Sequence, residues 1–572
     1  MGSIGDPSSG LEYEVLVIGA GLSGIFTLYR MQQLGLKTIA LEAGSGEGGT
    51  WFWYGWISSR CITVLINTRN RYPGVQFDSE SISYGFSEFS QEVLDEWNWT
   101  ETFAHGDETL RYAQFLTDKF NLRQYMQFNT RVKSARWREK SNSWLVTDNT
   151  RFIITALGIL NEPTLPNIPG VENYHGEAFH TSRWPSEWTF KDKRVGIIGT
   201  GATGIQIIQE IVKPQYGMKS LTVFQRTPNW SAPLRNELIS SDEMKVYREQ
   251  YPEIFEQCAK SYAGFMHVAD TRRTLEVPEE EVNPSPALRT GSMTDLPQRL
   301  AFWEILYAKP GFAKWLGNFA DINTDRDANA AFSAFIAAKI RARVNDPVTA
   351  EKLVPKNHGF GTRRVPLETQ YFEAYNKSNV RLIDVANEAP IDHITEKGIQ
   401  LQTGEHIELD ALIYATGFDA VTGPMTAIDW HGVDNTKLCD IWTEGPRTYL
   451  GLFVHKLPNM MMVLGPHQAF GNIPRSIQFA VTWISDLINF CEGKGIKRVE
   501  CRSEKVEEWT QHVWDCSKGL LMSQVDSWMT GVNTNVKGKQ KRIIARYSGS
   551  GPGYRKRCLD VAESEYRDLD LE

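Results

Sequence analysis

The chain has 572 residues, of which 41% are hydrophobic and 23% charged. This length predicts three or four units, and the composition is typical of a globular protein with an ample core. The formal net charge of −8 argues against a nucleic-acid partner, and no apolar run is long enough to predict a membrane span.

The seven cysteines include no C-x-x-C pair. Their odd number and their spacing argue against a zinc ribbon and a redox disulfide, and favour reduced thiols. Residues 1–11 are small and polar and have no apolar signal core, so we predict a disordered tail there. Together these features favour a cytoplasmic location.

After this tail, the chain has the pattern of a dinucleotide-binding fold. Residues 13–18 form an expected buried strand, and residues 25–34 place apolar side chains at helical spacing. Between them lies a glycine triplet, Gly19, Gly21 and Gly24. Such a triplet lets the backbone approach a pyrophosphate and aims the helix N-terminus at its charge. The next strand, residues 37–42, ends in Glu42, where such folds place the acid that binds the ribose.

A second unit of the same kind begins at residue 195. A short apolar strand, residues 195–198, leads into a glycine triplet followed by apolar residues at helical spacing. The triplet consists of Gly199, Gly201 and Gly204. One triplet is a weak signal, but two complete ones predict two dinucleotides. Arg226 stands at the end of the next strand, where an NAD-binding unit has an acid, and a guanidinium suits the 2′-phosphate of NADPH.

The segment before the second triplet reads Tyr174-x-Gly176-x-x-x-His180-x-x-x-Trp184-Pro185. It resembles the fingerprint F-x-G-x-x-x-H-x-x-x-W-P of the Baeyer–Villiger monooxygenases, flavoproteins that insert one atom of dioxygen beside a ketone carbonyl. Tyr174 replaces the usual Phe and keeps an aromatic ring. The resemblance covers almost the whole chain and implies FAD in the first unit and NADPH in the second. We expect His180 to link domains and not to act as an acid or base.

The predicted fold class is α/β, with two Rossmann-like dinucleotide-binding domains, a small antiparallel sheet and a helical insertion. The FAD-binding domain is expected to be discontinuous, at residues 12–160 and 385–572, and the NADPH-binding domain to occupy residues 161–384. The helical insertion is placed at about residues 235–345.

Shorter elements are predicted inside these domains. Strands of the antiparallel sheet are expected at residues 131–137 and 143–147, and a long helix of the insertion at residues 328–343. Small residues at 411–419 are expected to close the second unit and cross back to the first.

Two segments, residues 48–53 and 70–81, look like halves of one family motif, G-G-T-W-x-W-N-R-Y-P-G-x-x-x-D-x-E-S, which wraps the flavin ring. An atypical insertion at residues 54–69 separates them. Because its removal restores the motif, we interpret it as a retained in-frame intron or another error of gene prediction. The short turn at residues 148–150 looks like a deletion. A protein that binds FAD and NADPH without catalysing therefore stays an alternative.

The resemblance also assigns cofactor-binding residues. Those expected near FAD are Gly19, Gly21, Gly24, Glu42, Gly49, Thr50, Trp51, Trp53, Asp78, Tyr84, Val132 and Ile473. Those expected near NADPH are Gly199, Thr200, Gly201, Gly204, Arg226, Thr227, Arg363 and Trp528. Trp528 lies in a segment similar to the family's mobile C-terminal loop. No metal ligand is predicted.

The catalytic pair is also assigned by resemblance. The sequence Phe360-Gly-Thr-Arg-Arg364 resembles the family's F-G-T-[KR]-R, whose final arginine is catalytic, so Arg364 takes that role and Asp78 is its carboxylate partner. In the family, NADPH reduces FAD, and a flavin C4a-peroxide formed with O2 attacks the ketone to give an ester or lactone. A fixed cation stabilises negative charge that develops during such an attack.

Other functions share some of these motifs. A flavin monooxygenase that oxygenates nitrogen or sulfur shares both triplets and a similar fingerprint, but Trp184-Pro185, Asp78 and Arg364 favour the ketone-oxidising branch. A disulfide reductase would need a redox cysteine pair, which the sequence lacks. The sequence does not identify the ketone or the oligomeric state.

Overall fold

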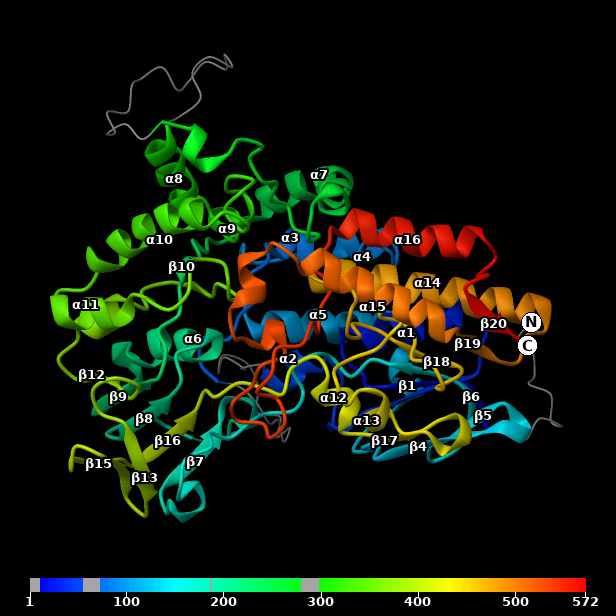
Figure 1. The fold of residues 1–572 in the computed structure, drawn as a ribbon, viewed down its shortest axis with the longest axis horizontal. Helices are drawn as coiled ribbons and strands as arrows, with labels where there is room; N and C mark the ends of the chain where they lie inside the picture. Colours follow the sequence, from blue (N-terminus) through cyan, green and yellow to red (C-terminus); the bar gives the residue numbers. More distant parts are fainter. Residues whose placement is uncertain (1–10, 55–71, 186–187, 279–297) are drawn as a thin grey trace.

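Two sheets, one in each lobe of the molecule, organise the fold (Figure 1). The computed structural model describes residues 11–54, 72–185, 188–278 and 298–572. Among these residues, no helix combines the length and apolar character needed to cross a membrane. The predicted tail lies outside the described residues except for Leu11. The predicted insertion at 54–69, and with it the retained-intron hypothesis, lies outside them except for Tyr54.

The first sheet has the strand order β17-β4-β5-β6-β1-β2-β3, and β18 also pairs with β6. The strands are β1 (Tyr13–Ile18), β2 (Thr38–Leu41), β3 (Met126–Gln127), β4 (Ser134–Arg138), β5 (Ser143–Leu145), β6 (Asn149–Thr155), β17 (Asp429–His431) and β18 (Met460–Met462). At the centre, β1 runs parallel to β2 and β6. Val15 and Val17 face one core cluster and Leu16 and Ile18 another, because successive side chains of a strand point to opposite faces.

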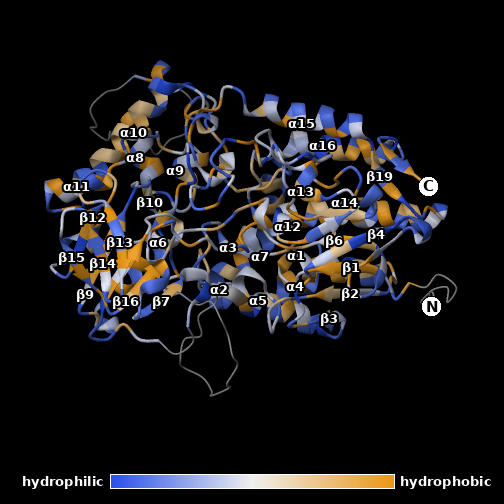
Figure 2. Ribbon diagram, turned by 60° about the horizontal axis from the view of Figure 1, so that its bottom comes forward, coloured by the Kyte–Doolittle hydropathy of each residue, from blue (hydrophilic) through white to orange (hydrophobic). Residues whose placement is uncertain are grey.

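The second sheet is entirely parallel, in the order β12-β9-β8-β16-β7. Its strands are β7 (Glu177–His180), β8 (Arg194–Ile198), β9 (Ser220–Gln225), β12 (Val380–Asp384) and β16 (Ala411–Tyr414). Val195, Leu412 and Ile413 are fully buried, as expected for parallel strands covered on both faces. Figure 2 shows the contrast between buried strands and the surface: β16 and β1 have hydrophobic colour, and the outer helix α15 (Ser503–Ser517) has hydrophilic colour.

In each of the two large sheets, one strand leads through a glycine turn directly into a helix. α1 (Leu22–Gln33) follows β1 and α6 (Ala202–Ile211) follows β8. α1 packs against α14 (Ile473–Lys494). The remaining helices outside the insertion are α2 (Thr50–Tyr54), α3 (Ser81–Tyr84), α4 (Gln91–Glu96), α5 (Gly106–Lys119), α12 (Gly423–Thr426), α13 (Leu438–Ile441) and α16 (Gly551–Glu563).

The helical insertion lies between the short paired strands β10 (Ala232–Pro233) and β11 (Leu367–Glu368). Its helices are α7 (Ser241–Lys260), α8 (Arg299–Ala308), α9 (Ala313–Leu316), α10 (Arg326–Arg341) and α11 (Pro347–Leu353). α10 confirms the long helix predicted at residues 328–343. It begins two residues earlier because the Asp325 carboxylate accepts hydrogen bonds from the backbone N–H groups of Asp327 and Ala328, both at 3.0 Å.

The predicted antiparallel strands form, but they extend the first sheet. β4 pairs with β5 and β5 with β6, both antiparallel, and β6 continues into the parallel part. The turn between β5 and β6 is closed by the backbone N–H of Val146, which donates to the Asp148 carbonyl at 3.2 Å. A separate antiparallel sheet consists of β13 (Ile391–Thr395), β14 (Gly398–Leu401) and β15 (His406–Glu408). β19 (Val499–Cys501) and β20 (Leu569–Leu571) form a further pair.

Two crossing segments connect the lobes and are hydrogen-bonded to each other. The backbone N–H of Thr164 donates to the Gly417 carbonyl at 3.0 Å, and that of Asp419 donates to the Glu162 carbonyl at 2.7 Å. The Thr164 hydroxyl also donates to the Thr416 carbonyl at 3.1 Å. Because β16 precedes the second crossing, the second sheet includes chain beyond residue 384, the predicted domain boundary.

Candidate active site

A cavity of about 1580 Å³ lies where the two lobes meet. Its walls include residues of both glycine turns, among them Gly21 and Gly201. The other predicted residues that line it are Gly19, Glu42, Gly49, Thr50, Trp51, Asp78, Tyr84, Val132, Arg226, Thr227, Arg363, Arg364, Ile473 and Trp528. Gly24, Gly199, Thr200 and Gly204 lie behind the cavity wall, and nothing is described of the Trp53 side chain.

The two turns have almost the same geometry. Gly19 has φ +108° and Gly199 has φ +110°, a region that residues with a Cβ rarely adopt. A Cβ on Gly19 would lie 2.5 Å from the Ala156 carbonyl oxygen, and one on Gly199 would lie 2.4 Å from that of Ala415. Glycine is therefore required at both positions. Each turn directs a helix N-terminus at the cavity, as pyrophosphate binding requires.

Glu42 lies at the end of β2, beside the first turn. Its carboxylate accepts hydrogen bonds from the backbone N–H groups of Ala20 at 2.8 Å and Gly44 at 2.6 Å. Burial raises the pKa of Glu42, and these two bonds lower it. Since each carboxylate oxygen has two lone pairs, the side chain can still accept from a ribose hydroxyl.

Aromatic residues around the predicted flavin motif form one wall. The Trp51 indole N–H donates to the Tyr84 hydroxyl at 3.2 Å, and Tyr84 stacks on Phe77 with ring centroids 4.2 Å apart. The Tyr72 hydroxyl donates to the Gln206 side chain at 2.7 Å. Gln206 belongs to α6, so this motif contacts the helix that follows the second turn.

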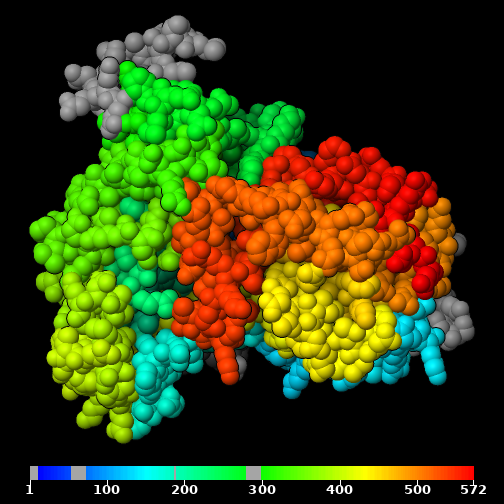
Figure 3. Space-filling view, viewed as in Figure 1, coloured from blue at the N-terminus to red at the C-terminus, as the bar shows by residue number. Residues whose placement is uncertain are grey.

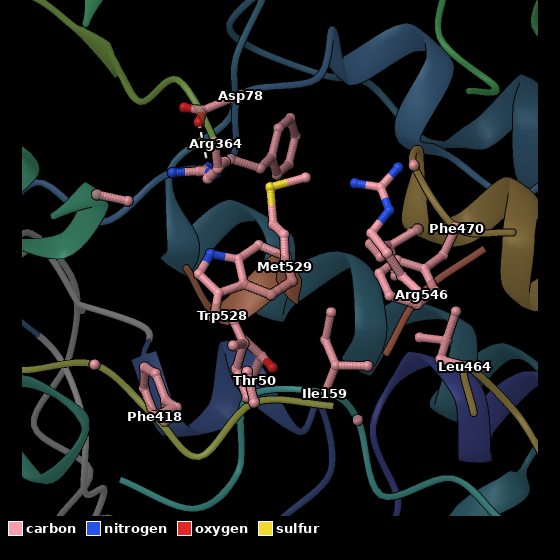
Figure 4. Close-up of a pocket in the computed structure, with 18 of the residues that line it drawn as sticks. Thr50, Asp78, Ile159, Arg364, Phe418, Leu464, Phe470, Trp528, Met529 and Arg546 are labelled. Carbon is pink, nitrogen blue, oxygen red and sulfur yellow. Dashed lines mark hydrogen bonds and ion pairs between the residues drawn. The ribbon is translucent and has the colours of Figure 1, made fainter. Parts of the chain in front are cut away.

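Arg364 and Asp78 form an ion pair on the cavity wall, although they are far apart in the sequence (Figure 4). The Arg364 guanidinium donates to Asp78 Oδ2, and Asp78 Oδ1 has no hydrogen-bond partner among the described residues. Asp78 is 4% exposed, and its pKa is raised by burial and lowered by Arg364. Because Arg364 keeps 32% of its side chain exposed, its charge reaches into the cavity.

Arg226 and Arg363 bring two positive charges together near the second turn. Burial lowers the pKa of Arg363, and the neighbouring Arg226 lowers it further. The Arg226 guanidinium donates to the Thr534 hydroxyl at 2.8 Å, and the buried Nε of Arg363 has no partner among the described residues. Two arginines that repel each other beside a cavity form a site for an anion with several oxygens.

His180 connects the fingerprint to the crossing segment. One ring nitrogen bonds the Ser182 hydroxyl at 2.8 Å, and the other bonds the Gly417 carbonyl at 3.0 Å. Burial lowers the pKa of His180 to about 4. Near neutral pH the ring is therefore uncharged. The Tyr174 hydroxyl, which a phenylalanine would lack, donates to the Leu409 carbonyl at 3.0 Å.

The segment around Trp528 covers the junction of the lobes, where it appears in orange-red in Figure 3. Lys539 pairs with Asp419 and donates to the Thr422 hydroxyl at 2.8 Å. The Asn533 side chain donates to the Phe418 carbonyl at 2.9 Å. These contacts join the segment to the crossing chain.

Sequence reasoning missed several residues that line the cavity. Ile159, Leu464, Phe470, Met529 and Arg546 all face it (Figure 4). The apolar members had no distinguishing pattern. Arg546 had one, because a single arginine interrupts the run Ile543-Ile-Ala-Arg-Tyr547.

The fold and cavity thus define a protein built to bind two dinucleotides side by side. A family model described as flavin-binding monooxygenase-like matches residues 12–231. The chain is 39% identical to 2-oxo-Delta(3)-4,5,5-trimethylcyclopentenylacetyl-CoA monooxygenase of Pseudomonas putida, over 98% of each chain. It is 34% identical to cyclohexanone 1,2-monooxygenase of Acinetobacter sp, over 99% of this chain and 98% of that one.

A solved structure described as OTEMO in complex with FAD and NADP matches with a TM-score of 0.87 at 38% identity, and the match covers 98% of this chain and 100% of that one. The chain belongs to the Baeyer–Villiger monooxygenases within the flavin-binding monooxygenase-like family.

Proposed function

We propose that this protein is an NADPH-dependent Baeyer–Villiger monooxygenase that uses FAD and O2 to convert a ketone into an ester or lactone. The observation that carries the proposal is the Arg364–Asp78 pair on a cavity that both glycine turns line. Ring ketones are the first substrate class to test, because the two relatives are named for ring ketones.

The residues present fit FAD at the first turn. A Cβ on Gly49 would lie 2.7 Å from the Cα of Gly21, so both positions need glycine where the backbone meets the cavity. Glu42 would accept from the ribose, and Trp51 and Tyr84 would flank the ring. Bound FAD, once reduced by NADPH, supplies the activated oxygen for the reaction.

The second turn fits NADPH. Within the described part of the chain, no atom lies within 4 Å of a Cβ placed on Gly201, and this position opens directly to the cavity. Arg226 and Arg363 would bind the 2′-phosphate, and Thr227 and Trp528 would contact the nucleotide from the adjoining wall. Two cations at that place select NADPH over NADH, because NADH lacks the phosphate that balances them.

Arg364 would stabilise negative charge that develops on the reacting oxygens. An arginine stays charged at every working pH, so its cation is available without a proton transfer. Asp78 fixes the guanidinium and offsets the free energy of its burial.

We also propose a boundary for the NADPH-binding unit. It extends to residue 414, because β16 lies in its sheet. A reducing compartment such as the cytoplasm suits the six described cysteines, which are all free thiols.

The test measures NADPH oxidation by FAD-loaded protein with cyclohexanone and cyclopentanone, and identifies the lactone by gas chromatography. Ketone-dependent lactone at one molecule per NADPH is the expected result. Thioanisole serves as the comparison substrate. Sulfoxide without any lactone would instead establish the sulfur-oxygenating alternative, and protein that never binds FAD would establish an inactive relative.

A further inference from the structure

Arg546 is a cation on the cavity wall that the reaction described above does not use. It follows Ala545 and precedes Tyr547, both buried, and its Nε is buried without a hydrogen-bond partner. Among the described residues, no carboxylate oxygen lies within 4.0 Å of its nitrogens, and the Phe470 ring lies 5.8 Å from the guanidinium carbon. Burial lowers the pKa of Arg546.

The carboxylates of the cavity wall already have hydrogen-bond or ion-pair partners in the protein. Four acidic residues line the cavity: Glu42, Asp78, Glu162 and Asp526. Glu42 accepts two backbone N–H groups, and Asp78 pairs with Arg364. Glu162 lies 3.7 Å from Arg131, and Asp526 lies 2.5 Å from Arg542. The protein thus supplies no anion to Arg546 from this wall.

Arg475, which like Arg546 is half-buried and has an Nε without a partner among the described residues, shows how this chain satisfies the rest of such a group for structural purposes. Arg475 on α14 donates to the Ser87 hydroxyl at 2.9 Å and to the Gly85 carbonyl, and its guanidinium carbon lies 4.4 Å from the Phe255 ring centroid. Among the described residues, Arg546 has no equivalent acceptors. Since its half-buried guanidinium has no protein partner there, we expect its partner to come from a ligand.

Arg546 lies apart from Arg364 on the cavity wall. In Figure 4, Arg546 and Arg364 extend into the cavity from opposite sides, with Met529 between them. Leu464 and Phe470 adjoin Arg546 and make the surroundings apolar. Tyr262, Ser548 and Ser550 also line the cavity and add polar groups to its wall.

We propose that Arg546 binds an anionic group of the substrate, so that the preferred ketone carries a carboxylate, or a phosphate at the end of a carrier thioester, on the side away from Arg364. This inference rests on the proposed function. The apolar surroundings accept the carbon skeleton, and the guanidinium binds the anion through paired hydrogen bonds.

The test compares 2-oxocyclopentylacetate with its methyl ester as substrates of the FAD-loaded full chain. Wild type is expected to favour the acid over the ester by about 10- to 100-fold in kcat/KM, as for a hydrogen bond to a charged group. R546M should bring this ratio near one, and R546K should keep part of it. K133M, which removes an exposed charge elsewhere on the cavity wall, is the matched control and should keep the wild-type ratio.

A binding measurement separates this inference from the oxygenase activity. Cyclopentylacetate and cyclopentylacetamide, which are not ketones, are titrated into FAD-loaded protein with NADP+ present, and the flavin absorbance is followed. Tighter binding of the carboxylate in wild type, lost in R546M, supports the inference even if no ketone is oxygenated. Free coenzyme A that displaces cyclopentylacetate from wild type, and that binds R546M more weakly than wild type in a direct titration, would assign the anion to a carrier phosphate.

Two results would overturn the inference. One is an acid-to-ester ratio and a carboxylate affinity that are the same in wild type and R546M. The other is loss of FAD from R546M with no change in carboxylate preference, which would show that Arg546 serves the flavin.

Discussion

The first and second glycine turns have nearly the same backbone and opposite charges beside them. Gly19 and Gly199 differ by 2° in φ, from +108° to +110°, and each meets a carbonyl oxygen that excludes a Cβ. Glu42 follows the first turn and Arg226 the second. The turn thus sets where a pyrophosphate lies, while one residue at the next strand end sets which nucleotide is accepted.

Replacing one glycine at a time should remove the binding of one cofactor and leave that of the other. These variants are expected to have the largest effects. Gly19→Ala should abolish FAD binding, because the Cβ would lie 2.5 Å from a backbone oxygen that cannot move aside. Gly199→Ala should keep FAD and abolish NADPH binding. The ratio of flavin absorbance to protein, and NADPH titration, measure the two effects.

Gly35→Ala is the control for these variants. Gly35 has φ +71° but no atom within 4 Å of a Cβ, so it carries only the backbone strain of about 1–2 kcal/mol. Equal loss of both cofactors in Gly19→Ala and Gly199→Ala would contradict separate sites.

Replacing Arg364, the partner of Asp78, tests whether the two dinucleotide sites serve one reaction. Arg364→Met should lower lactone formation by about 10²- to 10³-fold, as does the loss of one group that stabilises developing charge. Lactone formed per NADPH consumed is the measurement. Arg381→Met, which removes an exposed arginine paired with Glu405, is the control. Lactone formation within threefold of wild type in Arg364→Met would exclude the assigned role.

Replacing Arg226, which follows β9, tests the difference in charge between the two glycine turns. Arg226→Ala should raise the KM for NADPH by about 10-fold and leave that for NADH nearly unchanged, because one charge-assisted contact to the 2′-phosphate is lost. Arg363→Ala should act in the same direction. The ratio of kcat/KM for the two nucleotides is the readout, and a parallel rise in both KM values would argue against a phosphate site.

His180, in the fingerprint segment that precedes the second glycine turn, is expected to affect stability and to have the smallest effect on activity. Its folded pKa of about 4 lies below the ordinary value of 6.5, so the unfolded state binds more protons between these values. Stability from this group is complete above pH 6.5 and is lost as the pH falls toward 4. Between pH 7 and pH 5 the loss is about 2 kcal/mol.

His180→Asn should therefore reduce the acid sensitivity of the unfolding temperature, while lowering that temperature at pH 7. Thermal unfolding followed at several pH values shows both changes. His467 and His358 are also buried with lowered pKa values, so some acid sensitivity should persist. Identical pH profiles of wild type and His180→Asn would show that the ring is not the titrating group.

The glycine turns and the strands around them were predictable because local patterns determine them. A buried strand, a triplet and an amphipathic helix are each visible within a short window, and β1, α1, β8 and α6 form as expected. The contact between Asp78 and Arg364 was predictable only through resemblance, since no local rule brings together residues so distant in the chain.

Other features depend on packing and could not be read from the sequence. The β13–β15 sheet and the inclusion of β16 in the second sheet follow from which strands pair, which short apolar runs do not specify. The partner of Lys539 is a carboxylate brought close by the fold, Asp419. Arg546 interrupts an apolar run in the sequence, but only the fold shows that it lines the cavity.

The hydrogen bonds between the two crossing segments also have a mechanical consequence. Because the two segments are hydrogen-bonded to each other, a rotation of one lobe against the other would have to move both segments together. The distance between spin labels placed on α5 and α10 should accordingly keep a narrow distribution as nucleotide is added. A Thr164→Val variant, which removes the hydroxyl bond to Thr416, should broaden that distribution.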